Sequence, residues 1–130
     1  LERQESVAIT HLRPDAGLPV YRVVSQLGEV GIVRPIDPGA VPETLTFRRD
    51  GANATNVQVV VPSSLSPNAA PLYSAGETTT LATLLFTVHD HFAANVYPDT
   101  PGLRLDIEIE VTSDDRIVIK QARPYLAVEP

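Results

Sequence analysis

The sequence predicts an α+β fold, in which a mostly antiparallel sheet packs against one long amphipathic helix. Most candidate elements are short segments of strand-type residues bounded by Pro, Gly, Asn or Asp. Twelve prolines, with only three Phe, four Tyr and no Trp, indicate many short elements separated by turns. One segment, about residues 76–94, has apolar residues at helical spacing.

The composition is that of one globular domain. The chain has 130 residues, of which 43% are hydrophobic and 20% charged, and this is enough to bury a core. It begins with Leu1 and contains no Met, so we expect residues 1–130 to be a single domain or a fragment of a longer protein. No N-terminal apolar run is long enough for a signal peptide or a membrane span, so no membrane partner is expected.

The charge and the absence of cysteine exclude several kinds of partner and site. The net charge is −6 and the pI is about 4.9, and no Lys/Arg cluster is present to neutralise a phosphate backbone. Nucleic acid is therefore not an expected partner. The absence of Cys excludes a disulfide framework, a thiolate metal site and a cysteine nucleophile. It also fits a cytoplasmic location, which we expect.

The predicted strands lie between turn residues. In chain order they are Ser6–Thr10, Val20–Ser25, Glu29–Arg34, Thr44–Arg48, Val57–Val61, Arg104–Thr112 and Arg116–Gln121. Asp50-Gly51 is a hairpin-turn signal, so the preceding Arg48-Arg49 is interpreted as a charge pair at the end of a strand. The turn-rich residues 62–71 predict a connector between the β part and the helix.

One helix is predicted after this connector. Ser74, with Glu77 three residues later, predicts a capping box at its start, and Pro98 lies beyond its end. Its apolar stripe consists of Leu81, Leu84, Leu85, Val88 and Phe92. His89 and His91 are two residues apart, so on a helix they point roughly 200° apart and do not chelate one ion together. We expect them to flank the apolar stripe on either side.

The predicted strand 105–111 carries the strongest functional signal. Its apolar residues alternate with Asp106, Glu108 and Glu110, so the period of two puts three carboxylates on one face. Like charges at this spacing repel each other unless water, a base or a metal lies between them. Asp106 and Glu108 offer the oxygen ligands that Mg²⁺ prefers, and two carboxylates plus nucleotide phosphates commonly hold this ion. The alternative is an ordinary acidic strand that faces solvent.

The segment 119–124, Ile-Lys-Gln-Ala-Arg-Pro, completes a longer pattern. Asp106-Ile107-Glu108, a short hairpin and this segment together resemble the closing part of the nucleotide-binding domain of the phosphoenolpyruvate synthase and pyruvate phosphate dikinase family. The resemblance implies an ATP-grasp-like fold with ATP and Mg²⁺ as cofactors. It implies metal-ligand roles for Asp106 and Glu108. It also implies that Gln121 contacts the metal or a phosphate and that Arg123 contacts a phosphate, both as cofactor-binding and catalytic residues.

A second part of the resemblance lies upstream. Val24-Ser25-Gln26-Leu27-Gly28-Glu29, followed by Val33-Arg34-Pro35, is similar to the family's Gln-x-Gly-Glu stretch, which implies nucleotide contacts for Gln26 and Glu29. Pro42-Glu43 follows in the family's order. No glycine-rich phosphate loop is present, and in the family that loop lies in the first part of the domain. The resemblance therefore implies that this chain is the C-terminal third of the domain. Its expected partners are the domain's remaining N-terminal half and a phosphohistidine domain.

The turn of the hairpin decides whether the candidate groups meet. If Asp114-Asp115 forms a two-residue turn, Glu108 faces Gln121 and the four groups gather on one face. If the loop has three residues, Glu108 faces Lys120 and Gln121 joins the apolar face. The apolar residues after the turn favour the second register. A bulge near Lys120 satisfies both.

We therefore expect a fragment of an ATP-dependent phosphotransferase that contributes the Mg-ATP end of the phosphotransfer site and is inactive alone. The alternative is a stand-alone β-rich binding or scaffolding module without catalysis, in which the acidic row is solvated. A third possibility is a degenerate family member that keeps the fold and has lost turnover. No stretch around His11, His89 or His91 resembles the family's catalytic histidine motif, so none of them is assigned that role.

Overall fold

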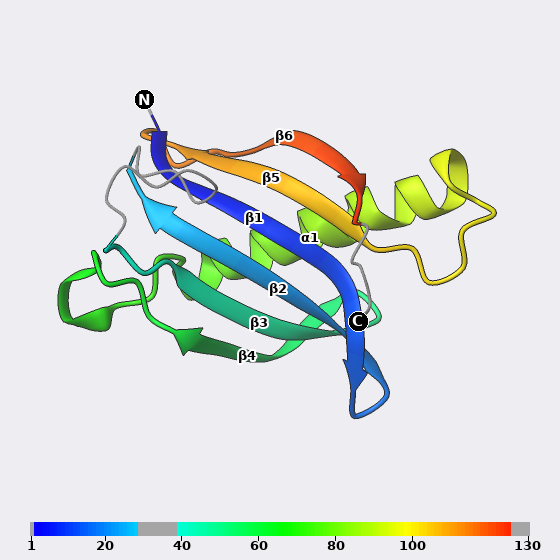
Figure 1. Cartoon of the computed structure of the whole chain (residues 1–130), viewed down its shortest axis with the longest axis horizontal. Coiled ribbons are helices and arrows are strands. Elements are labelled where there is room, and N and C mark those ends of the chain that lie inside the picture. Colours follow the sequence, from blue (N-terminus) through cyan, green and yellow to red (C-terminus); the bar gives the residue numbers. More distant parts are fainter. Residues whose placement is uncertain (1, 29–38, 126–130) are drawn as a thin grey trace.

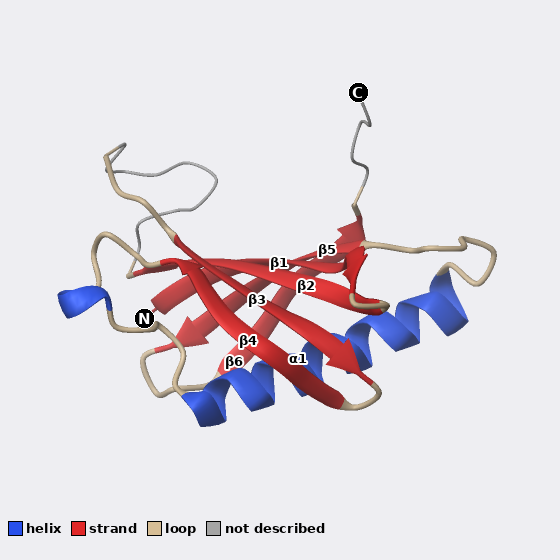
Figure 2. Cartoon of the chain, turned by 90° about the horizontal axis from the view of Figure 1, so that it is seen from below, coloured by secondary structure: helices blue, strands red, loops and turns tan. Residues whose placement is uncertain are grey.

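The computed structural model describes residues 2–28 and 39–125 of the chain. These residues form an α+β structure, in which a six-stranded antiparallel sheet carries one long helix on one side (Figure 1, Figure 2). The general fold class predicted from the sequence is confirmed. The predicted strand Glu29–Arg34 lies outside the described residues.

The described strands alternate in direction along one continuous sheet. They are β1 (Glu2–Asp15), β2 (Leu18–Leu27), β3 (Glu43–Asp50), β4 (Asn53–Val61), β5 (Leu105–Thr112) and β6 (Ile117–Pro124). The helical segments are the 3-10 turn η1 (Pro67–Ala69), the helix α1 (Ala75–His91) and the π-helical turn η2 (Phe92–Val96). The strand order is β4-β3-β2-β1-β5-β6, so β1 lies inside the sheet and pairs with both β2 and β5.

The turn between β3 and β4 contains the predicted hairpin-turn residues Asp50 and Gly51. Gly51 has φ +61°, a left-handed conformation that glycine adopts without the strain a side chain would add. The arginines before the turn each form an ion pair, Arg48 with Asp15 at 2.7 Å and Arg49 with Asp90 at 2.6 Å. Both therefore serve as charge-pair partners at the end of a strand.

The helix α1 starts with the predicted capping box. Ser74 Oγ accepts a hydrogen bond from Glu77 N at 3.1 Å, and Glu77 Oε1 accepts one from Ser74 N at 2.9 Å. The regular helix ends at His91 rather than near residue 94, and the chain continues as η2, where Asn95 Nδ2 donates to His91 O at 3.2 Å. No helix in the described ranges is long and apolar enough to cross a bilayer.

Replacing Ser74 with alanine is expected to lower the free energy of unfolding by about 1 kcal/mol, because the Glu77 N–H loses its side-chain acceptor. Urea unfolding followed by circular dichroism measures this change. Ser74→Asp is the matched control, since it retains a capping oxygen and should stay close to the unmodified chain. An equal loss in both variants would show that the cap is not the cause.

The core lies between α1 and the sheet. It consists of Ala8, Tyr21, Val23, Leu45, Phe47, Tyr73, Leu81, Ala82, Leu85, Phe86, Leu103, Leu105, Ile107, Ile109 and Val111. His89 is only 4% exposed and continues the buried face of α1, whereas His91 is exposed. The expectation that both histidines flank the apolar stripe therefore holds for His91 only. His89 lies one helical turn after the fully buried Leu85. Its ring forms a hydrogen bond with Thr10 of β1, which offsets the cost of burying a polar side chain.

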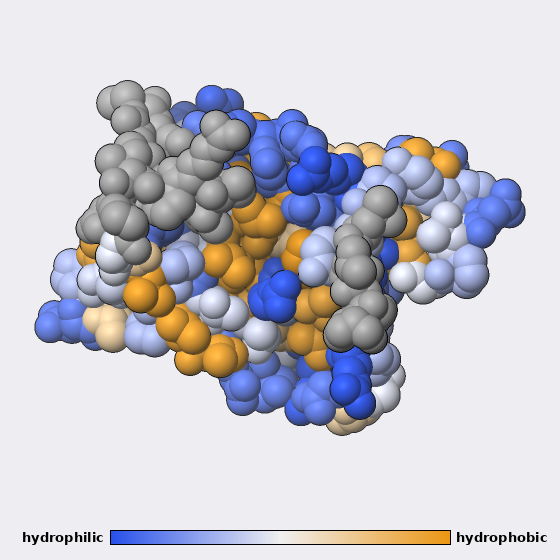
Figure 3. All heavy atoms as spheres, viewed as in Figure 1, coloured by the Kyte–Doolittle hydropathy of each residue, from blue (hydrophilic) through white to orange (hydrophobic). Residues whose placement is uncertain are grey.

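The side of the sheet opposite α1 is called the open face. It includes Glu5, Val7, Ile9, Arg22, Val24, Thr44, Thr46, Asp106, Glu108, Glu110, Gln121 and Arg123. Val7, for example, pairs with Val24 on one side and with Glu108 on the other. Figure 2 shows that α1 lies on the other side of the sheet. Figure 3 looks onto the open face, where apolar side chains lie in the middle of the view among hydrophilic ones.

Candidate functional site

The carboxylates of β5 lie on the open face, as their alternation predicts. Leu105, Ile107, Ile109 and Val111 are fully buried, and the residues between them are partly exposed. The side chains of Asp106 and Glu110 are 21% and 26% exposed. The pleat therefore separates the two sets, because successive side chains of a strand point to opposite faces.

The hairpin of β5 and β6 contains both predicted registers, joined by a bulge. Close to the turn, Val111 pairs with Ile117 and Ile109 with Ile119, which is the register of a three-residue loop. The ladder then shifts by one residue, so that Glu108 pairs with Gln121. Lys120 is the extra residue. A bulge of this kind lets the apolar residues near the turn reach the core and still turns Gln121 to the open face.

The four candidate groups of the hairpin are brought together in two cross-strand pairs. Asp106 is paired with Arg123, and Arg123 Nη2 lies 3.6 Å from Asp106 Oδ2. Glu108 is paired with Gln121 on β6 and with Val7 on β1. Arg123 is well exposed, with 64% of its side chain accessible. The guanidinium is therefore free to contact an anion above the sheet as well as Asp106.

Further charges border these pairs. Glu110 Oε2 lies 3.9 Å from the Lys120 ammonium, and Glu5 of β1 is paired directly with Glu110. A cross-strand pair of like charges is destabilising unless a cation lies nearby. Lys120 offsets that repulsion in part. The sequence indicates Lys120 only as a residue on which the hairpin register depends. Glu5 is found beside Glu110 only through the pairing of β1 with β5.

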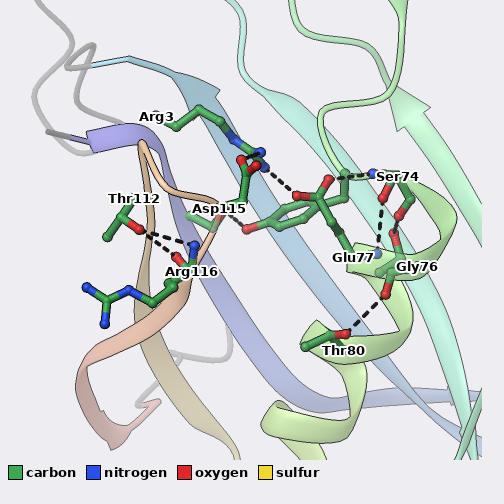
Figure 4. A network of polar contacts seen from close by, with 11 residues as sticks. Arg3, Ser74, Gly76, Glu77, Thr80, Thr112, Asp115 and Arg116 are labelled. Atoms are coloured by element: carbon green, nitrogen blue, oxygen red, sulfur yellow. Dashed lines mark hydrogen bonds and ion pairs between the residues drawn. The ribbon is translucent and has the colours of Figure 1, made fainter.

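The tip of the hairpin is tied to β1 and α1. Arg3 donates hydrogen bonds to Asp115 and to Glu77, the latter at 2.7 Å (Figure 4). Burial acts to raise the pKa of Glu77, but the hydrogen bonds from Ser74 and Arg3 outweigh it and lower that pKa. Thr112 N donates to Arg116 O at 2.9 Å and closes the loop. The network fixes the turn end of the hairpin relative to the helix.

The oxygen donors of the hairpin are of the type that Mg²⁺ prefers. Asp106 and Glu108 contribute two carboxylates on one face. Within residues 2–28 and 39–125, no three or more His, Asp or Glu side chains surround a common metal position. Two protein carboxylates suit Mg²⁺ when phosphate oxygens and water complete its octahedral shell, whereas a cage made only of protein ligands needs more.

The upstream residues named by the sequence have other surroundings. Gln26 is 2% exposed, and its amide is occupied by Ser63 Oγ at 2.5 Å, Leu27 N at 3.0 Å and Val41 O at 3.1 Å. Glu43 lies on the α1 side and accepts a hydrogen bond from Leu72 N at 2.8 Å, and burial raises its pKa. Glu29 and Val33-Arg34-Pro35 lie outside the described residues.

A groove on the α1 side contains none of the predicted site residues. It has a volume of about 1200 Å³ and lies between α1 and β6. Thr79, Thr80 and Thr87 of α1 line it, and each donates its hydroxyl to a carbonyl one turn earlier in the helix. The wall therefore offers mainly methyl groups. The sequence gives little sign of this, since three threonines suggest a polar surface.

Two carboxylates, an amide and a guanidinium on one open face can hold a cation and an anion side by side. No protein-family model, curated protein or solved structure matches this chain.

Proposed function

We propose that this chain supplies the Mg-ATP end of the phosphotransfer site in an ATP-dependent phosphotransferase resembling phosphoenolpyruvate synthase and pyruvate phosphate dikinase. The chain would be the C-terminal part of an ATP-grasp-like domain. The observation that carries the proposal is the bulge at Lys120, which turns Gln121 and Arg123 to the same face as Glu108 and Asp106. The same bulge lets Ala122 pack against the core while Gln121 and Arg123 stay on the open face, so the site groups and the packing are accommodated together.

Each group has a distinct part in this proposal. Asp106 and Glu108 would hold Mg²⁺, which neutralises charge on the phosphate oxygens when it is bound. The Arg123 guanidinium would hold a phosphate through charge-assisted hydrogen bonds, and its 64% exposure leaves it accessible. Gln121, opposite Glu108, would donate from its amide to a phosphate oxygen or contribute its carbonyl to the metal.

The isolated chain is expected to bind nucleotide weakly and to turn over none. Phosphoryl transfer depends on positioning and on charge stabilisation by several groups at once. Among the described residues, the proposed site has one arginine and two carboxylates, and no glycine-rich phosphate loop is present. The N-terminal half of the domain, ATP and a phosphohistidine domain are therefore the proposed partners.

A second candidate function is a β-rich binding or scaffolding module without catalysis. The contacts of Asp106 with Arg123 and of Glu110 with Lys120 favour it, because they give two of the carboxylates partners within the hairpin. The internal hydrogen bonds of Gln26 favour it as well. In such a module the acidic row would be solvated and would show no dependence on Mg²⁺.

Titration of Mg-ATP into the chain, followed by backbone NMR signals of residues 105–123, tests the proposal. We expect shifts confined to the hairpin that require Mg²⁺ and that become at least tenfold weaker in Asp106→Ala/Glu108→Ala. Glu110→Gln is the matched control, because Glu110 lies on the same strand and face and is not a proposed ligand. Absence of hairpin shifts at millimolar Mg-ATP, or shifts that persist in the double variant, would contradict it.

Two single-residue deletions separate the role of Gln121 from that of the bulge. Deleting Lys120 removes the bulge and keeps Gln121 opposite Glu108. Deleting Gln121 shortens the strand equally but brings Lys120 opposite Glu108. We expect the Mg-ATP shifts to survive the first deletion and to be lost in the second. Equal binding in both variants would remove Gln121 from the site.

A further inference from the structure

The buried His89 and the half-buried His11 stack against each other where the end of α1 meets β1. The rings of His11 and His89 have centroids 3.6 Å apart and planes 12° from parallel. Tyr21 of β2 packs edge-on against His11 with a centroid separation of 5.3 Å. The two histidines are far apart in the sequence and come from different elements, so no motif points to them.

His89 takes part in a chain of hydrogen bonds with Thr10 and Leu105. Its Nδ1 lies 2.7 Å from Thr10 Oγ1, and this oxygen accepts a hydrogen bond from Leu105 N at 2.9 Å. The Thr10 hydroxyl can donate its own hydrogen to Nδ1, and with this hydrogen bond the neutral His89 ring has its proton on Nε2. A second proton, on Nδ1, would leave the buried Thr10 hydroxyl without an acceptor.

A proton added to the His11 ring would also find no hydrogen-bond acceptor. His11 lies at a register shift of β1 and has φ +47°, and Arg104 Nε donates to its carbonyl at 3.2 Å. Its Nε2 is buried and has no hydrogen-bond partner. A proton gained at this position would be a buried charge without a counter-ion, which is costly.

The charged groups around the stack do not remove that cost. Arg49 of β3 and Asp90 of α1 face it, and both carboxylate oxygens of Asp90 already accept from Arg49, at 2.8 and 2.6 Å. Burial, then His89 and Arg49, lower the pKa of His11 to about 4, against the smaller opposite effect of Asp90. Burial is also the main cause that lowers the pKa of His89. Tyr21 and Arg104 are the other titratable groups in contact with the pair or its backbone.

We infer that the His11–His89 stack is an acid-sensitive latch, which holds the end of α1 against β1 and the start of β5 while both rings are neutral and releases them when a proton is taken up. The unfolded or opened chain binds protons below its ordinary histidine pKa of 6.5, whereas folded His11 resists until about 4. The latch is therefore fully closed above pH 6.5 and weakens as the pH falls from 6.5 towards 4.

Amide hydrogen exchange of the chain between pH 7 and pH 5 tests the latch. The protection factor, which is corrected for the intrinsic pH dependence of exchange, should fall at least tenfold more for Leu105 N–H than for Val23 N–H in the core of β2. In His11→Phe, which keeps an aromatic ring and removes the titration of His11 while His89 still titrates, this difference should be reduced. His91→Gln is the matched control on the same helix and should behave like the unmodified chain.

An equal fall at Leu105 and Val23 would overturn the latch, since it would show only global unfolding. The same pH dependence in His11→Phe would overturn it too. If that variant does not fold, ¹⁵N spectra of the imidazoles in the unmodified chain decide. We expect His89 to be neutral at pH 7 with its proton on Nε2, and a charged His89 with full protection at Leu105 would exclude the latch.

Discussion

Replacing Ile107 with alanine is expected to lower the free energy of unfolding by about 3 kcal/mol. Ile107 is fully buried in the core between β5 and α1, so the shorter side chain loses its transfer free energy and leaves a cavity among rigid neighbours. Urea unfolding monitored by circular dichroism measures the change as a shift of the midpoint at constant slope.

The adjacent residue provides the matched control. Glu108 is on the open face, so Glu108→Ala should change the free energy of unfolding by less than about 0.5 kcal/mol. The contrast between neighbours in sequence tests the orientation of the whole strand, because a slip of one residue exchanges the two faces. Similar losses in both variants would show that β5 is not oriented as described.

The alternation in β5 is the part of the fold and of the candidate site that the sequence predicts best. Four apolar and three acidic residues repeat with a period of two, and burial follows that period along the strand. The helix is predicted almost as well, since its capping box and its apolar repeat are both local signals. Such elements are predictable because the interactions that define them lie within a few residues of one another.

The register of the hairpin between β5 and β6 could not be predicted from local signals alone. The two registers predicted different faces for Gln121, and the turn residues alone did not select between them. The structure uses one register for Ile117 and Ile119 and the other for Gln121, with Lys120 as the extra residue. A bulge depends on what each side of the strand must contact, so its position follows from tertiary packing.

Pairs of residues that are far apart in the sequence could not be predicted from it. Glu5 has no acidic neighbour two residues away, and its position beside Glu110 follows only from the pairing of β1 with β5. The long β1 strand was predicted only for Ser6–Thr10, because its polar ends have no apolar alternation. Arg3, near the start of that strand, nevertheless fixes the hairpin tip through Asp115 and Glu77.

Thr10→Val is expected to lower the free energy of unfolding by about 3 kcal/mol, although the two side chains have nearly the same shape. The Thr10 hydroxyl is fully buried, accepts from Leu105 N and is bonded to His89 Nδ1. A methyl group in its place leaves a buried donor and a buried ring nitrogen unpaired, and each costs about 1–3 kcal/mol. Chemical unfolding at pH 7.5, where the histidines are neutral, isolates this loss from their titration.

Thr10→Ser separates the hydroxyl from the methyl group. Serine keeps both hydrogen bonds and loses only the γ-methyl, so about 1 kcal/mol of destabilisation is expected, well short of the valine variant. Because β-branched residues favour strands, propensity alone would rank valine above serine at this position. A valine variant more stable than the serine variant would therefore show that packing and propensity, rather than the hydrogen bonds to His89 and Leu105, hold β1 to α1 and β5 at this point.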